Sequence, residues 1–416
     1  METNLEDVKS WATQEAKSQL REYFDSKSLL HLPRFSRPRV SILLVLYNRA
    51  ELTLSCLRSL QPHLETANAE IVLVDNASSD ETSKLFDSIR GATIVRNSRN
   101  QGYAEGVNRA AAAAVGEYLL FLNNDTRLLD DSLNAAINFL STHGDVGAVG
   151  GRIVLLDGTL QEAGCTLWRE GDAFQYGRGD NPASPEYLFQ RDVDYCSGAF
   201  LMTRRELFEK MNGLDPAFAV GYFEDIDYCV RLWRAGWRVV YLPEVMILHY
   251  ENGSSDDPTC IPPSYRRNHL YFTRKHADWL AFQCPSTTPR LWARGSHDDR
   301  FRILYLTRAD SDHQASSDAT MIRCLRELNC FVTVYPIVET SALRDNRKLP
   351  WPADVEVLTG DSLKTLPRFL TQRRNYYDLL ITNDAKIAKF TKRWATTRTE
   401  SNNKAHIEPT IELSGV

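Results

Sequence analysis

The chain alternates short apolar runs with segments whose apolar residues repeat every three or four positions. Three runs are almost wholly apolar, as in strands buried on both faces: 40–46, 71–74 and 118–122. Helical repeats lie between or after them, at 51–60, 108–115 and 133–140. Strands that alternate with helices predict an α/β fold, with a mixed and mainly parallel sheet covered by helices on both faces.

The same pattern divides the chain into five zones. We expect an N-terminal amphipathic helix, an α/β domain, a polar linker, a smaller Rossmann-like α/β segment and a frayed or disordered tail. Their bounds are 1–35, 36–284, 285–300, 301–385 and 386–416. Within the larger domain Asp157-Gly158 predicts a hairpin, and therefore some antiparallel structure.

The first zone repeats apolar residues from Leu5 to Phe24 at helical spacing, with Trp11 and Ala12 among them. This face is expected to pack on the next domain or on another subunit, so a homo-oligomer is left open. The polar face mixes acids and bases, which makes a membrane-surface role the weaker interpretation.

Composition narrows the class of protein. The chain has 416 residues, of which 43% are hydrophobic, enough for two or three folded domains. Its 54 acids outnumber its 49 bases, giving a net charge of −5, so we expect no nucleic-acid partner. The eight cysteines include no CxxC pair and no Cys/His ligand spacing, which argues against a zinc ribbon or a redox dithiol.

No apolar run approaches the roughly 20 residues that a membrane-spanning helix needs. The N-terminus also lacks the basic-then-apolar build of a signal peptide. We therefore expect a cytoplasmic protein with reduced thiols, and leave open peripheral contact with the inner face of the membrane.

Polar clusters follow three of the predicted strands, at Tyr47-Asn48, at 75–80 and at 123–125. In an open α/β sheet, ligands bind beyond the carboxyl ends of the strands. Each cluster has a structural alternative: Ser78 and Glu81 match a capping box, and Asn and Asp favour turns. Their recurrence at one edge of the sheet nevertheless predicts a shared site.

Three further segments carry candidate chemistry. The stretch 100–108 places glycines at a helix start, where backbone N–H groups can approach a phosphate, although it is not a Walker loop. Glu224, Asp225 and Asp227 stand at the start of another helix. Acids often complement a helix dipole there, but three in four residues exceed that need and predict a site carboxylate. His249 ends the predicted strand that precedes it.

In this order the motifs resemble family 2 inverting glycosyltransferases of the GT-A fold, especially the rhamnosyltransferase-like branch. The series is Tyr47-Asn48, Val74–Asp80, Asn100-x-Gly102-x-x-x-Gly106-x-Asn108, Leu122–Asp125, Ser197–Phe200, Glu224-Asp225-x-Asp227 and His249. The resemblance spans about Pro38 to His276. It implies transfer of a sugar, with inversion, from a nucleotide diphosphate sugar to a hydroxyl of a saccharide or lipid-linked saccharide in a growing cell-surface glycan.

The resemblance also implies a role for each residue. The donor-binding residues would be Tyr47, Asn48, Asp75, Asn100, Gly102, Asn108 and Asn124. Gly198, Ala199 and Phe200 would flank the acceptor. Mn²⁺ or Mg²⁺ would be held by Asp125 and His249, with Asn123 standing where the family has a second Asp.

The resemblance implies that a carboxylate removes the proton of the attacking hydroxyl. We expect Asp225 to be this general base, with Glu224 as the second choice. A helix N-terminus lowers the pKa of a carboxyl group, whereas a neighbouring acid raises it, and the sequence leaves open which effect prevails.

Two other functions are left open. A catalytically silent sugar-nucleotide binder or scaffold has no use for the acids at 224–227. A sugar-1-phosphate nucleotidyltransferase, which has a related fold, needs a glycine-rich basic loop where Tyr47-Asn48-Arg49 stands.

Two parts of the chain stay outside these roles. The segment 265–275 interleaves aromatic and basic residues, and we favour a solvated basic face over contact with a diphosphate or an anionic lipid acceptor. Zone 301–385 resembles the opening part of a GT-B glycosyltransferase, and we expect no activity from it. An assembly module, an acceptor-docking module and the remnant of a longer protein are left open as its role.

Overall fold

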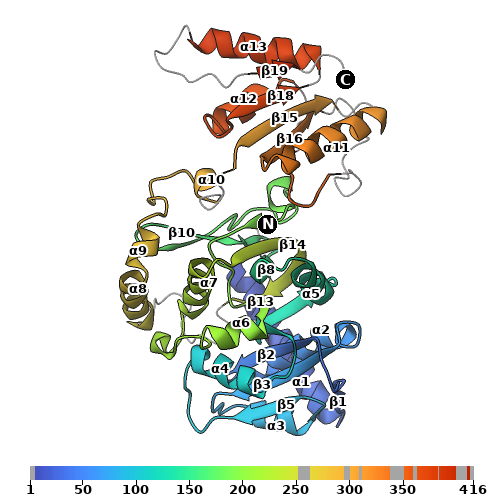
Figure 1. Cartoon of the computed structure of the whole chain (residues 1–416). Helices are drawn as coiled ribbons and strands as arrows, with labels where there is room; N and C mark the ends of the chain where they lie inside the picture. The colour runs from blue at the N-terminus through green and yellow to red at the C-terminus, as the bar shows by residue number, and fades with distance from the viewer. Residues whose placement is uncertain are drawn as a thin grey trace. The chain divides into compact units, whose positions relative to one another are not determined.

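The structure is a computed structural model that describes residues 5–251, 263–294, 300–308, 312–337, 351–358, 363–382, 384–399 and 410–412. The chain forms two compact units. Unit 1 comprises Met1–Pro182 with Arg191–His297, and unit 2 comprises Ala183–Gln190 with Asp298–Val416. Each unit has its own sheet (Figure 1).

Unit 1 is built on a ten-stranded mixed sheet of order β12-β14-β8-β13-β6-β2-β3-β5, with β7 paired to β14 and β9 to β8. The strands are β2 Val40–Leu46, β3 Ala69–Asp75, β5 Thr93–Arg96, β6 Tyr118–Leu122, β7 Thr126–Leu129, β8 Val146–Leu155, β9 Leu160–Ala163, β12 Arg191–Asp192, β13 Phe200–Arg204 and β14 Arg238–His249. The neighbours β6, β2, β3 and β5 run parallel, whereas β13 runs antiparallel to both β6 and β8. The predicted strands 40–46, 71–74 and 118–122 and the Asp157-Gly158 hairpin between β8 and β9 are confirmed.

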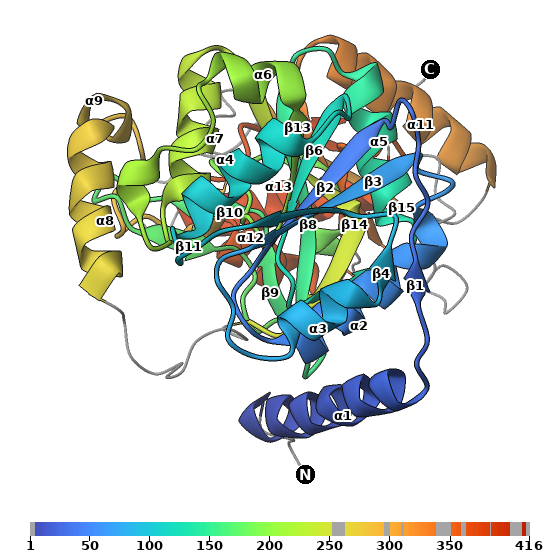
Figure 2. The same ribbon diagram turned by 90° about the horizontal axis from the view of Figure 1, so that it is seen from below.

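Helices cover both faces of this sheet. They are α1 Leu5–Asp25, α2 Ala50–Leu60, α3 Thr82–Asp87, α4 Tyr103–Ala113, α5 Ser132–Thr142, α6 Arg205–Lys210, α7 Glu224–Arg234, α8 Pro263–Lys275, α9 Ala277–Leu280 and α10 Arg290–Ala293. Because side chains alternate along a strand, Ile42 and Leu44 of β2 join the core with α2 and α5, while Val45 lies against Gly106 of α4. Figure 2 shows α4 and α7 on one side of the strands and α2 and α3 on the other.

Short elements complete unit 1. Leu30–His31 (β1) pairs in parallel with Ile89–Arg90 (β4), and Cys165–Leu167 (β10) pairs with Ala173–Gln175 (β11) in antiparallel fashion. The 3₁₀ turns are η1 Gln61–His63 and η3 Pro216–Phe218.

The N-terminal helix packs on its own domain, as the apolar repeat predicts. Ala12 and Ala16 of α1 form a small apolar cluster with Leu52 of α2 and with Tyr250. Trp11, expected on the buried face, is instead 67% exposed. A helix turns by about 100° per residue, so burial of alanines at this interface turns Trp11 outward.

Unit 2 is a five-stranded parallel sheet of order β17-β16-β15-β18-β19. Its elements are η2 Pro185–Tyr187, β15 Arg302–Arg308, α11 Asp312–Glu327, β16 Phe331–Ile337, β17 Glu356–Val357, α12 Leu366–Gln372, β18 Leu379–Thr382, α13 Ala385–Thr399 and β19 Thr410–Glu412. The strand order outward from β15 is that of a doubly wound domain, as expected of the Rossmann-like segment.

Three predictions about domain limits need correction. The tail predicted from 386 contains α13 and β19. Strand β19 was missed because the pattern of a three-residue strand is too short to recognise, and pairing with β18 stabilises it. Residues 400–409 and 413–416 of that tail lie outside the described residues. The predicted linker contains α10. Residues 183–190, expected in the larger domain, belong to unit 2, where Phe189 lies against Phe331.

Two predicted absences can be compared with the structure. None of the helices in the described part of the chain is both long and apolar enough to cross a membrane. Seven cysteines lie in the described ranges, and all seven are free thiols.

Candidate active site

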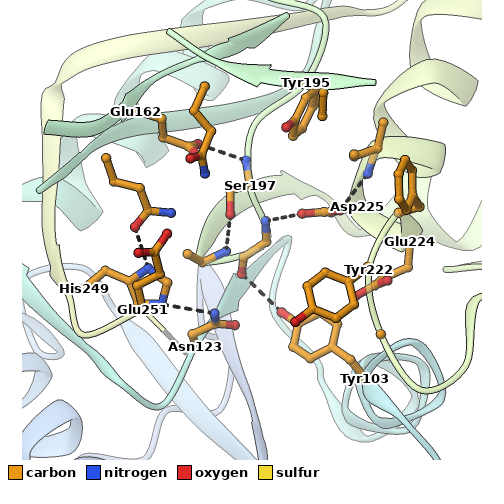
Figure 3. A pocket seen from close by; sticks show the side chains of 18 of the residues that line it. Tyr103, Asn123, Glu162, Tyr195, Ser197, Tyr222, Glu224, Asp225, His249 and Glu251 are labelled. Carbon is orange, nitrogen blue, oxygen red and sulfur yellow. Dashed lines mark hydrogen bonds between the residues drawn. The ribbon is translucent and has the colours of Figure 1, made fainter. Parts of the chain in front are cut away.

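A cavity of about 1060 Å³ opens at the carboxyl ends of β2 and β6. The end of β14, strand β9, the start of α7 and the first turn of α8 also line it. Figure 3 shows the polar side chains that point into this space. The cavity therefore lies beyond the strand ends, where the sequence predicts a site.

Asp125 and His249 meet on the cavity wall although 123 residues separate them in the sequence. Strand β7 pairs with the end of β14 so that His249 stands opposite Thr126, which brings Asp125 beside the imidazole. Nε2 of His249 lies 3.1 Å from Oδ1 of Asp125 and 3.4 Å from Nδ2 of Asn123. The three residues expected to hold a metal thus converge at one point.

The imidazole of His249 is oriented by a residue that the sequence analysis missed. Its Nδ1 lies 2.8 Å from Oε1 of Gln161, so this nitrogen carries a proton. Its Nε2 faces a carboxylate oxygen, and therefore either carries a second proton or binds a cation. Burial lowers the pKa of His249, but the charge and hydrogen bond of Asp125 outweigh it and raise the pKa overall.

The donor set fits a hard divalent cation. Asp125 offers a carboxylate, His249 a nitrogen and Asn123 an amide, which suits Mn²⁺ and, through the oxygens, Mg²⁺. No cluster of three or more His, Cys, Asp or Glu side chains suited to a metal occurs in the described ranges, so Asn123 is the side chain that would complete the set.

The carboxyl group of Asp225 lines the same cavity and is held by backbone N–H groups. Its Oδ2 accepts a hydrogen bond from Gly198 N–H at 2.8 Å, and its Oδ1 accepts one from Ile226 N–H at 2.8 Å. Burial raises the pKa of Asp225, and these hydrogen bonds oppose the rise only in part. The sequence left open whether the pKa of this carboxyl group is lowered or raised, and in the structure desolvation raises it.

The neighbouring acids have different environments. Glu224 is buried at the cavity wall, and its Oε2 has no hydrogen-bond partner within the described ranges. Burial, reinforced by the charge of Asp225, raises the pKa of Glu224. Asp227 is fully buried away from the cavity and binds Arg231 at 2.8 Å and both Lys275 and His276 at 2.7 Å. One of the three predicted acids therefore anchors helices.

Two of the three predicted acceptor residues reach the cavity. Gly198 and Ala199 line it. The prediction for Phe200 is wrong: its side chain is fully buried in the main apolar core. Strand β13 begins at Phe200, and the first strand side chain turns toward the core.

The donor-binding predictions are only partly met by the cavity. Asn124 lines it, and its Nδ2 donates to Oγ1 of Thr53 at 2.9 Å. Tyr47, Asn48 and Asp75 are outside the lining, at the ends of β2 and β3.

Asn48 joins the loop after β2 to the loop after β3, and Asp75 stabilises the loop after β3. Oδ1 of Asn48 accepts a hydrogen bond from Ser79 N–H at 2.8 Å, and Oδ1 of Asp75 accepts one from Ser78 N–H at 2.8 Å. The predicted capping box is wrong, because α3 begins at Thr82 and Asp80 accepts the Thr82 N–H. Asp75, predicted to bind the donor, thus closes its own loop.

The glycine-rich segment starts α4 as predicted, but its polar side chains serve the backbone. Asn100 Oδ1 accepts the Gly102 N–H at 2.9 Å. Gly102 has φ +86°, and a Cβ there would stand 3.0 Å from the carbonyl oxygen of Val220, so the position requires glycine. The amide of Asn108 bonds both the N–H and the carbonyl of Leu214 at 2.8 Å, a structural role in place of the donor contact expected.

Further cavity residues were not predicted from the sequence. They include Tyr103, Gln161, Glu162, Arg178, Tyr195, Tyr222 and Glu251. Burial raises the pKa of Glu162 to about 7, and its Oε1 accepts the Ser197 N–H at 3.3 Å. Gln161 and Glu162 stand next to each other in β9, which is buried along its length. Burial of two polar side chains costs free energy, and such a pair in a strand is a signal of a functional site.

Comparisons with known proteins place the domain. Residues 41–211 match the family described as Glycosyl transferase family 2. The chain is 30% identical over 225 residues to the O-antigen biosynthesis protein RfbC of Myxococcus xanthus, covering 52% of this chain but 18% of that protein. It is 26% identical over 256 residues to the N-acetylglucosaminyl-diphospho-decaprenol L-rhamnosyltransferase of Mycobacterium tuberculosis, covering 52% of this chain and 82% of that protein.

Among solved structures, the crystal structure of GalNAc-T7 with UDP, GalNAc and Mn²⁺ covers 58% of this chain and 50% of that chain, with 15% identity and a TM-score of 0.47. The matched segment 41–211 contains Asn123, Asp125 and Gly198, which line the cavity. Unit 1 of this chain therefore contains a glycosyl transferase family 2 domain.

Proposed function

We propose that unit 1 transfers a sugar from a nucleotide diphosphate sugar to an acceptor hydroxyl, with inversion at the anomeric carbon. The observation that carries this proposal is the convergence of the Asp125–His249 pair and Asp225 on one cavity. A metal-binding pair and a buried carboxylate are the two groups that such a displacement needs.

The relatives support an acceptor in a cell-surface glycan. One is named for O-antigen biosynthesis and another for rhamnosyl transfer to a diphospho-decaprenol saccharide. We propose a saccharide or lipid-linked saccharide as the acceptor of this chain. The cavity volume of about 1060 Å³ is large enough for a donor together with part of an acceptor.

The chain's own residues would hold Mn²⁺ or Mg²⁺ through Asp125, His249 and Asn123. When bound, the ion supplies positive charge that neutralises the departing nucleotide diphosphate. Gln161 keeps the Nδ1 proton of His249 in place, so that Nε2 presents its lone pair.

Asp225 is the better of the two candidate bases. Two backbone N–H groups stabilise its ionised form, whereas Oε2 of Glu224 is buried with no hydrogen-bond partner in the described ranges. Burial raises the pKa of both carboxyl groups, and the two backbone N–H groups favour the ionised form of Asp225. Figure 3 shows the side chains of His249 and Asp225 on either side of Ser197.

The test is a panel of nucleotide diphosphate sugars with Mn²⁺ or Mg²⁺, in which released nucleotide diphosphate is measured. At least one donor is expected to give metal-dependent release that Asp125→Ala abolishes. A saccharide acceptor should then increase the release, and NMR of the product should show an inverted anomeric configuration. If every donor gives the same background with the parent protein and with Asp125→Ala, the proposed function is wrong.

A further inference from the structure

Helix α8 has a charge composition unlike the rest of the chain. Between residues 263 and 275 it carries Arg266, Arg267, Arg274 and Lys275 and no acidic residue, whereas the whole chain has a net charge of −5. The helix lies at the outer edge of unit 1 in both views (Figures 1 and 2). It therefore presents a local positive surface on an acidic protein.

The outer face of α8 consists of exposed arginines around an exposed leucine. Arg266, Arg267 and Arg274 are exposed, and Leu270, which lies between them on the helix surface, is 56% exposed. Arg267 donates two hydrogen bonds to Oδ1 of Asn268, and within the described ranges no ion pair with an acidic residue is found for the three arginines. We call Arg266, Arg267, Leu270 and Arg274 the α8 outer face.

Large apolar side chains on α8 and after α9 are also exposed. Tyr271 is 38% exposed on α8, and Phe282, two residues after α9, is 89% exposed. A solvated basic face does not need exposed leucine and phenylalanine. Cations combined with exposed apolar side chains are instead typical of surfaces that adsorb to anionic bilayers.

The inner face of α8 is fixed to the wall of the cavity. Nδ2 of the fully buried Asn268 donates to the carbonyls of Phe218, Gly221 and Tyr222 at 2.8–3.1 Å. Ser264 and Tyr265, in the first turn of the helix, line the cavity themselves. A surface that contacts the α8 outer face is thereby held close to the entrance of the site.

We propose that the α8 outer face docks on an anionic phospholipid bilayer. The arginines attract the lipid headgroups, and Leu270 and Phe282 enter the interfacial region. The role of this docking would be to bring a lipid-linked acceptor to the cavity, and that role rests on the proposed function. The docking itself requires no catalysis, so it can be measured separately.

The experiment is co-sedimentation of the full chain with vesicles of phosphatidylcholine alone or with 30% phosphatidylglycerol. Binding is expected only to the anionic vesicles, and it should weaken as salt is raised from about 50 to 500 mM. Arg266→Gln, Arg267→Gln and Arg274→Gln together should lower the partition coefficient about 100-fold, since each surface arginine contributes about fivefold. Leu270→Ser should weaken binding without changing the salt dependence.

The matched control removes the same charge elsewhere. Lys17→Gln, Arg21→Gln and Lys27→Gln replace three exposed bases of the N-terminal region and should leave vesicle binding unchanged. Equal binding of the triple α8 variant and the parent overturns the proposal, as does equal binding to neutral and anionic vesicles. If the α8 variant instead shifts the sedimentation of the protein without lipid, the face contacts a second copy and the bilayer proposal is wrong. Failure of sugar transfer with normal vesicle binding contradicts only the proposed function.

Discussion

Three acidic side chains within the first turn of α7 show how environment separates residues of one type. Glu224 has a buried oxygen without a hydrogen-bond partner in the described ranges, and Asp225 accepts two backbone N–H groups. Asp227 is enclosed by Arg231, Lys275 and His276. The sequence presents these acids alike, because the groups that distinguish them come from distant segments.

The first prediction concerns the proposed base. Asp225→Asn should reduce the rate of transfer about 100-fold or more, because the amide cannot accept the proton of the acceptor hydroxyl. Donor affinity should change little, since Asp225 contacts backbone N–H groups and not Asp125 or His249, the residues proposed to hold the metal. Steady-state kinetics and donor titration measure the two effects. Asp87→Asn, on the exposed side of α3, is the control, and transfer by Asp225→Asn at the control's rate would exclude Asp225 as the base.

The second prediction concerns His249 in protein stripped of metal. Its pKa is raised above 6.5, so the imidazolium–carboxylate pair stabilises the fold below pH 6.5 and this contribution is lost as pH rises through the folded value. Asp125→Asn should lower the pKa of His249, because burial remains while the opposing charge is removed. NMR titration of the imidazole measures both proteins. An unchanged pKa in the variant would show that Asp125 does not govern this histidine.

At the scale of elements, the segment before α7 is positioned by a helix that follows it in sequence. Residues 218–222 leave η3 and lead directly to Glu224, and Val220, Gly221 and Tyr222 line the cavity. Asn268 of α8 donates to three carbonyls of this segment, and Lys275 and His276 bind Asp227 of α7. Helix α8, together with His276, thus holds Asp227 and the segment that leads to Glu224.

The third prediction tests this bracing. Asn268→Ala leaves three carbonyls without their donor and should destabilise the segment by about 1–3 kcal/mol. Hydrogen exchange of residues 218–223 should become faster, and the turnover rate should fall more than donor affinity. Thr273→Ala is the control, since its hydroxyl donates only to His269 of the same helix. Equal exchange in parent and variant would mean that Asn268 does not hold the segment.

At the scale of the whole molecule, the lining of the candidate site comes entirely from unit 1. Each unit has an apolar core of its own. Residues 183–190 are the exception to this separation, because they lie between parts of unit 1 in sequence and belong to unit 2. Tyr187 and Phe189 are buried there, at 2% and 1% exposure.

The fourth prediction follows from this division. A chain ending at His297 should bind donor with the affinity of the full chain, because it keeps every residue of the cavity. It should also aggregate more readily, since Tyr187 and Phe189 lose the unit to which they belong. Donor titration and light scattering measure these effects, and Tyr187→Ser with Phe189→Ser should restore solubility. Loss of donor affinity in the soluble double variant would show that unit 2 contributes to the site.

The sequence by itself determined the local elements and the edge of the sheet where the candidate site lies. Apolar runs and helical repeats depend on neighbours along the chain, so β2, β6, α2 and α5 were predicted close to their true limits. The carboxyl ends of parallel strands share one edge whatever the details of packing, and this predicted a shared site that includes residues 123–125. The pairing of Asp125 with His249 was predicted from the resemblance to the family.

Only the tertiary structure decided which polar side chains are free for chemistry. Asn108, Asp75 and Phe200 matched motif positions, yet each has a structural role. Asn108 bonds the distant backbone of Leu214, Asp75 closes its own loop, and Phe200 is buried in the core. Gln161 and Glu162 stood in no recognised motif and still reach the cavity. The hydrogen-bond partners and the burial of a side chain depend on segments that strand register and helix packing bring together. The spacing of residues along the chain does not reveal which segments these are.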